Sequence, residues 1–543
     1  MRIAVLFVLL LSGAVTQMCA QTSLPALSNN AIPSIIPPAP EAFALTRYGN
    51  NPIGLSTGAV QYSVPLYTIS TGTFSMPLSV SYSSNGLKVD EVSGRVGMQW
   101  KMDFAGIITR TVIGDPDELP SYMSPTSDVF SNEFYDFLRF VGPGGNGAKS
   151  FQPDIFTYAF PGYSGKFIIH EGTIVQIPYN NLKIEKTTLD FTITTPDGIL
   201  YSFGNGYYDG TLSSSAGGNS GVCIPENGGS VQSNSWYLTS IRLTNGDLIN
   251  YIYESIHPSN GLQTVKYLTG VNQTYTFLPS NRFQNPPLSY VPIQPVQTCF
   301  QLSEYTSVVL KEIQFPGGKV SLSYSGREDI MGEKKLDVLQ VTNQANQVVK
   351  LFGFNYEYSF YGNTDYDIGV PLQPTIQAAY PELRKRLFLT RVEDRTQDVL
   401  AYTFEYESIH SLPPRLSFAQ DYWGFFNGIK NQSLFPAYTY AGQFNEGGYD
   451  VGADRMGVFE HSCKGMLKRI TYPTGGSTSY EYQPAFKADY QVNKLSYNHI
   501  TFYGNTASTY TRYVSGNYTF SQNRYAKIRF SCSATPWQGK PYT

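Results

Sequence analysis

The sequence predicts an all-β protein in which many antiparallel hairpins join in extended, curved sheets with few helices. Aromatic residues make up 15% of the 543 residues, charged residues only another 15%, and 49 Gly and 34 Pro supply turns. Such a composition is typical of β-sheets with many turns. A helical array would be rich in Ala, Glu, Lys, Leu and Arg, and a disordered chain would be poor in aromatic residues.

The first 20 residues have the pattern of a secretory signal peptide. Arg2 supplies a positive start, residues 3–11 are all apolar, and small residues precede a cleavage site between Ala20 and Gln21. The apolar run is shorter than the roughly 20 residues that span a bilayer. A buried strand and a lipoprotein anchored through Cys19 are the alternatives. We expect a secreted or cell-surface protein without a membrane span.

The charge of the chain bears on nucleic-acid binding, and its cysteine content bears on disulfide formation. The chain has 38 Lys and Arg against 41 Asp and Glu, and no basic cluster stands out, so a nucleic-acid partner is not expected. Four cysteines follow the signal peptide: Cys223, Cys299, Cys463 and Cys532. Export permits two disulfides by any of three pairings. We expect Cys223 with Cys299 and Cys463 with Cys532, and four free thiols are the alternative.

Proline content and hydrophobic patterning divide the chain into five segments. Residues 1–20 form the signal peptide, and the Pro-rich residues 21–44 are interpreted as a linker. Residues 45–120 form an N-terminal β region, and residues 121–485 form a region of β-hairpins. Residues 486–543 resemble the start of a further β domain. We interpret the whole as a truncated reading frame.

Two strands are expected in the N-terminal β region. Apolar residues alternate with polar ones over 62–66 and 76–82, which indicates one buried and one solvated face. Pro65 and Pro77 predict strand edges or bulges, because proline cannot donate a ladder hydrogen bond.

One hairpin form recurs in the hairpin region. Four copies open with Leu, turn at Gly or Asn, and end in an aromatic residue; they span 189–203, 238–253, 310–324 and 467–482. Two looser copies span 336–356 and 389–406. A lone hairpin of this size is marginal in water, so we expect each copy to bury one face against a neighbour in a shared sheet. The gaps between copies are uneven, which argues against a solenoid of fixed period.

The N-terminal β region resembles a known family. The stretches concerned are Thr57–Ala59, Tyr62–Leu66, Pro77–Gly86, Val96–Trp100 and Gly106–Arg110. They are similar to the N-terminal part of RHS/YD-repeat proteins and to the SpvB-like N-terminal region of insecticidal toxin complexes. Family members usually have Gly-x-Gly-Trp where this chain has Gly97-Met98-Gln99-Trp100.

The resemblance continues through the hairpin region to secreted bacterial RHS-like proteins. The similar stretches are 153–156, 162–167, 195–198, 412–415, 420–424, 427–428 and 467–476. The Tyr-Asp dipeptide that names the repeat is replaced at the hairpin ends by Tyr253-Glu254, Tyr324-Ser325, Tyr406-Glu407 and Tyr482-Gln483. The copies are therefore either YD repeats or a divergent precursor region.

The resemblance implies a hollow β shell that often encloses a C-terminal toxin or effector. The self-cleaving core and the variable toxin segment have no counterpart before Thr543, so no enzymatic activity is carried over. We therefore expect an exported, non-enzymatic scaffold without cofactor or metal, whose partner would be a C-terminal effector. The alternative is a cell-surface adhesin or glycan-binding protein, and a third hypothesis is a hydrolase that uses Asp115 or Asp117.

Two acidic clusters are candidates for chemistry. Asp115, Asp117 and Glu118 could serve acid–base catalysis or bind calcium, although a solvated turn is the favoured interpretation. Asp365 and Asp367 could offer oxygens to calcium, but the spacing of an EF-hand loop is missing.

Two further clusters combine other side chains. His461-Ser462-Cys463 places reactive types together, but neighbours on a strand point to opposite faces and do not form a catalytic pair. Asp421–Phe426 is the densest aromatic cluster. We expect its rings to fill the core, and stacking on a sugar or peptide is the alternative.

Overall fold

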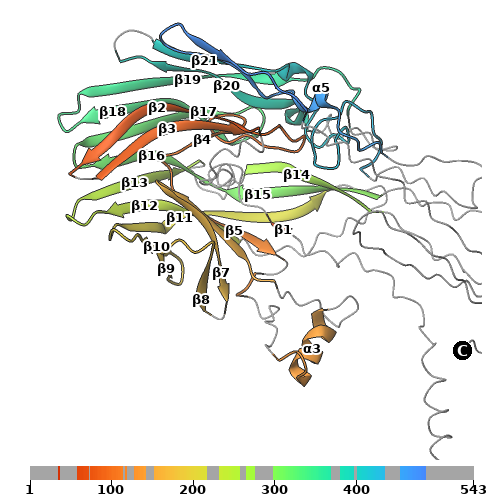
Figure 1. The fold of residues 1–543 in the computed structure, drawn as a ribbon, viewed down its shortest axis with the longest axis horizontal. Coiled ribbons are helices and arrows are strands. Elements are labelled where there is room, and N and C mark those ends of the chain that lie inside the picture. Colours follow the sequence, from red (N-terminus) through yellow and green to blue (C-terminus); the bar gives the residue numbers. More distant parts are fainter. Residues whose placement is uncertain are drawn as a thin grey trace, which may run out of the picture. The chain divides into compact units, whose positions relative to one another are not determined.

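The computed structural model describes about three fifths of the chain. The ranges are 35–36, 58–72, 74–113, 116–118, 128–141, 152–170, 172–216, 232–256, 265–274, 297–367, 380–396, 400–434 and 453–484. Most of these residues lie in antiparallel strands, which confirms the predicted all-β class (Figure 1). The helices described are α3 (Asn132–Val141), α5 (Phe459–Ser462) and the 3-10 helices η2 (Pro381–Arg384) and η3 (Ile409–Ser411). No helix in these ranges has the length and apolar character needed to cross a membrane.

A small sheet contains the two strands expected in the N-terminal region. It is ordered β2 (Val60–Thr71), β3 (Phe74–Ser84) and β4 (Trp100–Met102). Of the apolar positions that alternate in the sequence, Tyr62 is half-buried and the other six are buried: Val64, Leu66, Met76, Leu78, Val80 and Tyr82. The register shifts between Pro65 and Tyr67, so the proline lies at a bulge as expected.

All other described strands belong to one network of antiparallel pairs, a 20-stranded sheet. Its strands are β1 (Ile35–Ile36), β5 (Ile107–Ile113), β6 (Ile155–Phe160), β7 (Tyr163–His170), β8 (Thr173–Ile177), β9 (Lys183–Lys186), β10 (Phe191–Thr194), β11 (Leu200–Ala216), β12 (Gln232–Arg242), β13 (Leu248–Ser255), β14 (Val265–Thr274), β15 (Gln297–Thr306), β16 (Val308–Phe315), β17 (Gly318–Gly326), β18 (Lys334–Asn343), β19 (Val348–Phe360), β20 (Lys385–Asp394), β21 (Leu400–Tyr406), β22 (Leu467–Thr471) and β23 (Ser477–Ser479).

The six hairpins predicted from the sequence are consecutive neighbours in this sheet. They are β10–β11, β12–β13, β16–β17, β18–β19, β20–β21 and β22–β23, and each pairs with the next through one strand of each. The β14–β15 hairpin, inserted between the second and third copies, pairs with β11 instead. The uneven spacing in the sequence therefore reflects insertions that leave the pairing of the repeats intact.

Every junction between two hairpins has the same register. The last aromatic residue of one copy lies opposite the opening Leu of the next, and the register shifts at that point. The pairs are Phe203 with Leu238, Tyr253 with Leu310, Tyr324 with Leu336, Tyr356 with Leu389 and Tyr406 with Leu467. The residue after each Leu is the extra residue of a β-bulge, which bends the strand and increases its twist.

A side-chain hydrogen bond accompanies this register. The terminal Tyr hydroxyl of a copy donates to the carbonyl of the Leu that opens the same copy. The donors and acceptors are Tyr253 and Leu238 at 2.8 Å, Tyr324 and Leu310 at 2.8 Å, Tyr356 and Leu336 at 2.5 Å, Tyr406 and Leu389 at 2.5 Å, and Tyr482 and Leu467 at 2.5 Å. The first copy differs: it ends in Phe203, and its Leu189 is 65% exposed instead of buried.

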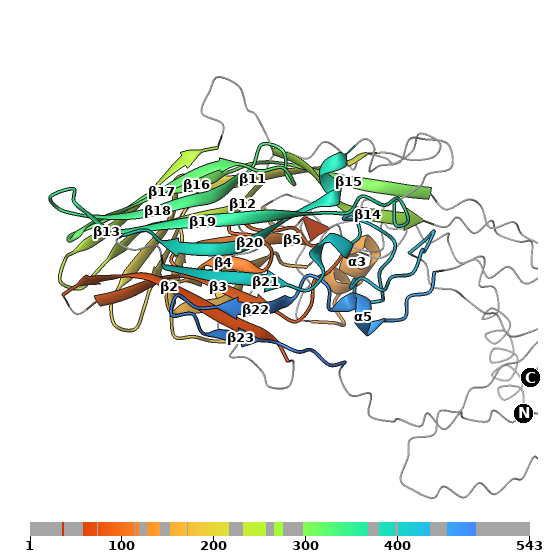
Figure 2. The ribbon, with the colours of Figure 1, turned by 90° about the horizontal axis from the view of Figure 1, so that it is seen from above.

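The small sheet packs its apolar side against the large one, and the two share a single hydrophobic core. Figures 1 and 2 show β2 and β3 running alongside strands of the large sheet. Polar contacts join the two sheets: Trp100 Nε1 donates to the Tyr406 hydroxyl at 2.8 Å, and the Leu467 amide donates to the Tyr82 hydroxyl at 3.1 Å. The N-terminal region is thus built into the hairpin sheet and is not an independent domain in its packing.

Candidate functional site

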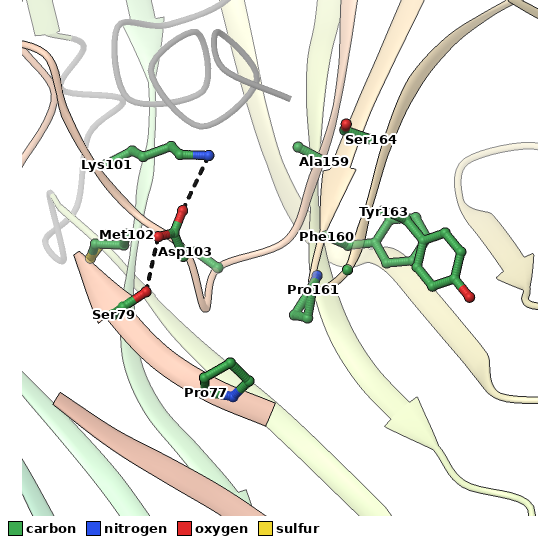
Figure 3. A pocket seen from close by; sticks show the side chains of 12 residues that line it. Pro77, Ser79, Lys101, Met102, Asp103, Ala159, Phe160, Pro161, Tyr163 and Ser164 are labelled. Carbon is green, nitrogen blue, oxygen red and sulfur yellow. Dashed lines mark hydrogen bonds and ion pairs between the residues drawn. The ribbon is translucent and has the colours of Figure 1, made fainter. Parts of the chain in front are cut away.

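A cavity of about 340 Å³ lies between the small sheet and the β6–β7 hairpin. Figure 3 shows Lys101 and Asp103 on one side, and Ala159, Pro161 and Ser164 on the other. The β3–β4 pairing places the polar pair there, and the tight β6–β7 turn supplies the apolar side.

The polar side of the cavity is a hydrogen-bonded group around one carboxylate. Asp103 accepts hydrogen bonds from the hydroxyls of Ser79 at 2.9 Å and Ser81 at 3.0 Å, and Lys101 Nζ lies 3.1 Å from it. The Lys101 and Asp103 side chains are 18% and 27% exposed, so both can offer a donor and an acceptor to a small polar ligand.

Buried ion pairs hold the loop that connects β3 to β4. Arg95, in this loop, lies 2.9 Å from Glu333, and both side chains are at most 3% exposed. Burial alone would raise the pKa of Glu333, but Arg95, a hydrogen bond from the Lys334 amide and the Arg327 charge together outweigh burial and hold that pKa below its usual range. Arg327 pairs with Asp329 at 2.8 Å in the same way. Removing one partner would leave an unpaired buried charge, which is strongly destabilising.

Arginines also bind backbone carbonyls of this loop. Arg327 donates to the carbonyls of Ser93 at 3.1 Å and Gly94 at 3.2 Å. Arg386, on β20, donates to the Val89 carbonyl at 2.8 Å. These arginines satisfy carbonyls that lie outside regular secondary structure, and each such buried group needs a partner. The loop is therefore fixed by the hairpin sheet.

Asp209 is a buried carboxyl group with a raised pKa, a property that catalytic carboxyl groups also have. Burial raises its pKa to about 7, against the opposing effect of a hydrogen bond from the Tyr237 hydroxyl at 2.6 Å. Its other oxygen, and the hydroxyl of the facing Ser235, have no hydrogen-bond partner in the described part of the chain. Perturbed groups in clefts are candidate catalytic residues, but Asp209 is 0% exposed, so we interpret it as structural.

The acidic cluster at Asp117 is joined to Asp154 by reciprocal hydrogen bonds and is not a fully solvated turn. The Asp117 carboxylate accepts the Asp154 amide at 3.0 Å, and the Asp154 carboxylate accepts the Asp117 amide at 3.3 Å and binds Arg110. Burial raises the pKa of Asp117 to about 6. Glu118 contacts Arg110 at 2.5 Å and Lys186 at 3.1 Å. Asp115 lies outside the described residues, and the hydrolase hypothesis gains no support from this geometry.

The second acidic cluster is held by basic side chains. Asp365 lies 2.8 Å from Lys430, and Asp367 pairs with Arg384. The two carboxylates thus have different cationic partners and do not converge on one ion. Within the described ranges, no group of three or more His, Cys, Asp or Glu side chains could hold a metal ion.

His461 and Cys463 lie in and directly after the short helix α5, so the strand assumed for them was wrong. His461 Nδ1 lies 3.2 Å from Lys464 Nζ, and its ring contacts Phe426 at 5.1 Å. Burial, followed by the Lys464 charge, lowers the pKa of His461. Burial raises the pKa of the Cys463 thiol, which makes it a weaker nucleophile at neutral pH. No catalytic pair is formed by His461 and Cys463.

The aromatic cluster is only partly in the core. Phe426 is 2% exposed, but Tyr422 and Trp423 are 58% and 69% exposed, so the core interpretation was wrong for these two rings. The Asp421 carboxylate accepts the amides of Trp423 at 2.8 Å and Phe425 at 2.9 Å. This turn directs the two rings outward, because the backbone bends sharply between them and Phe426.

Several predicted residues are not tested by the structure. Cys463 makes no disulfide to a described residue, and its expected partner Cys532 lies outside the described ranges. Cys223, the Cys299 side chain, and the cleavage site at Ala20 and Gln21 also lie outside what the structure describes. Disulfide pairing and signal cleavage therefore stay predictions.

Comparison with known proteins gives weak structural similarity. No protein-family model matches the chain, and no curated protein matches it. Crystal structures of TcdB2-TccC3-Cdc42 and TcdB2-TccC3 are each 11% identical with a TM-score of 0.29, covering 65% and 71% of this chain. A Photorhabdus luminescens Tc holotoxin pore with a TccC3 mutation is 10% identical with a TM-score of 0.30, covering 71%. The chain spans only 16% to 17% of the length of these chains.

Proposed function

We propose that this protein is an exported, non-enzymatic β scaffold, the N-terminal part of an RHS/YD-repeat-like protein that encapsulates or presents a C-terminal effector. The observation that carries the proposal is the repeated junction: five successive contacts between hairpins use one register. A sheet built by one rule can be extended by adding copies, which is what a large enclosure requires.

The side-chain chemistry also favours a structural role. The carboxylates whose pKa is most affected by their surroundings are Asp209, Glu333 and Asp117. They are wholly or partly buried and bind hydroxyl, backbone or charged partners inside the protein. The apolar face of the small sheet packs on the hairpins. A cargo would therefore have to lie beyond this packed N-terminal region.

Electron microscopy of the secreted natural protein tests the proposal. We expect a closed shell with enclosed density. A compact globular particle without an internal space would rule the scaffold out. A Leu389→Asp variant is the matched control, since a charge opposite Tyr356 should break the sheet and the shell together.

A second candidate function is glycan binding at the cell surface. The exposed Trp423 and Tyr422 rings, 6.5 Å apart at 81°, favour it, because exposed aromatic faces stack on apolar faces of ligands. Arg455 lies over the Tyr422 ring at 5.8 Å and holds it in place. Binding to a glycan array should be lost in Trp423→Ala and kept in Tyr179→Ala, another exposed aromatic. Binding that survives Trp423→Ala would remove this candidate.

A further inference from the structure

Among the described residues, the last hairpin of the sheet has an edge that no further strand covers. The residue pairings of β23 within the described ranges are with β22 alone. Figure 2 shows β23 at the border of the strands drawn. Tyr482 follows this strand, and its hydroxyl donates to the Leu467 carbonyl at 2.5 Å. The sixth hairpin thus carries the same internal hydrogen bond as the four before it, although no next strand is described.

The inner junctions define what this edge would accept. At each junction, the terminal aromatic residue of one copy faces the opening Leu of the next copy. A second contact joins the residue two positions before the aromatic residue to the residue three positions after the Leu. Examples of the second contact are Tyr251 with Ile313, Leu322 with Leu339, Phe354 with Val392 and Phe404 with Ile470. Tyr482 and Tyr480 are the corresponding residues at the edge. Both are half-buried, whereas Phe404 at the preceding junction is 2% exposed.

The extra residue at each bulge is polar at all five junctions. These residues are Thr239, Lys311, Asp337, Thr390 and Lys468. A partner strand would therefore have Leu at its first position, a polar residue at the second, any residue at the third and an apolar residue at the fourth. Strand addition gains affinity from main-chain hydrogen bonds and specificity from alternate side chains, and this pattern provides both.

We propose that the β23 edge, continued through Tyr482, is a docking site for an antiparallel β-strand that places Leu opposite Tyr482 and an apolar residue opposite Tyr480. The partner is defined by this chemistry, because the docking edge continues an interface already used five times in the same sheet. The inference goes beyond the scaffold proposal: it holds whether or not the sheet closes or encloses an effector, and electron microscopy of the shell tests that separately.

Peptide binding to the full chain tests the docking site. A labelled peptide of Val308–Phe315 supplies the strand, since its Leu310 and Ile313 make the inner contacts. Hydrogen exchange of the amides of residues 477–482 locates the binding. We expect saturable binding that slows exchange there. A Leu310→Asp peptide should bind at least tenfold more weakly, and this control leaves the protein itself unchanged.

Protein variants complete the test. Tyr482→Ala should weaken binding at least tenfold, and Tyr422→Ala, at an exposed ring elsewhere, should leave it unchanged. The proposal is overturned by an absence of binding, or by binding that is indifferent to Leu310→Asp. It is also overturned if the amides of residues 477–482 are already protected without peptide, because the edge would then be occupied.

Discussion

Gln99 shows how a single residue can keep a turn that its type disfavours. It has φ +64°, a left-handed conformation that costs a non-Gly residue roughly 1–2 kcal/mol. This is the position where the resembling family usually has Gly. Two buried hydrogen bonds compensate: Gln99 Nε2 donates to the Gly86 carbonyl at 2.8 Å, and the Tyr82 hydroxyl donates to Gln99 Oε1 at 2.9 Å. The departure from the family motif therefore leaves the turn intact.

Two substitutions at this position separate the strain from the hydrogen bonds. Gln99→Ala keeps the strain and loses both bonds, so we expect it to lower the free energy of unfolding by about 2 kcal/mol. Gln99→Gly loses the same bonds but removes the strain, so it should cost about 1 kcal/mol less than Gln99→Ala. Urea unfolding monitored by circular dichroism measures both. A Gly variant no more stable than the Ala variant would contradict this account.

Asp209 makes stability depend on pH. Its pKa is raised to about 7 in the folded protein by burial, above the unfolded value of about 3.9. The folded state therefore holds a proton that the unfolded state loses, and stability falls as pH rises from about 4 to about 7. The slope for one proton is at most about 1.4 kcal/mol per pH unit. Asp209→Asn should flatten this decline, measured by urea unfolding at pH 5, 6 and 7. An unchanged slope would show that Asp209 is ionised throughout.

At the scale of the element, the hairpin is defined by its closing hydrogen bond. The Tyr253 hydroxyl, in a side chain only 5% exposed, donates to the Leu238 carbonyl at 2.8 Å. Phe203, which occupies the same place in the first copy, makes its junction without a hydroxyl. The bond therefore adds stability but is not required for the register.

Tyr253→Phe is expected to lower the free energy of unfolding by about 1 kcal/mol, the net value of one such hydrogen bond plus the unsatisfied carbonyl. The exposed Tyr422→Phe is the matched control and should change it by less than about 0.5 kcal/mol. Thermal unfolding compares the two. Equal effects of both substitutions would mean that the Leu–Tyr bond carries no stability of its own.

Helix α3 shows where local patterning was missed. Ser131 accepts the Phe134 amide at 3.1 Å as an N-cap, and Glu133 lies in the first turn. This Ser-x-Glu start, followed by aromatic residues at helical spacing, is a readable helix signal. This helix was not predicted, because the aromatic-rich composition of the whole chain favoured strands. Helix η2 has a signal of another kind, because it begins with Pro381, and proline is favoured in the first turn of a helix.

At the scale of the whole molecule, export is the prediction that remains to be measured. N-terminal sequencing of the secreted protein should begin at Gln21, and non-reducing peptide mapping should find Cys223 with Cys299 and Cys463 with Cys532. Oxidising export compartments permit such bonds. An intact N-terminus at Met1 would remove the export prediction, and four free thiols would remove the pairing.

The sequence by itself determined the fold class, the six hairpins and their association, because period-two alternation and turn glycines are local signals that act over a few residues. It also placed the Leu and Tyr residues that make each junction. Only the tertiary structure decided which strands pair across insertions, that Arg95 and Glu333 meet in the interior, and that Trp423 faces outward. These contacts join residues far apart along the chain, and their free energy depends on burial and partners that no local pattern specifies.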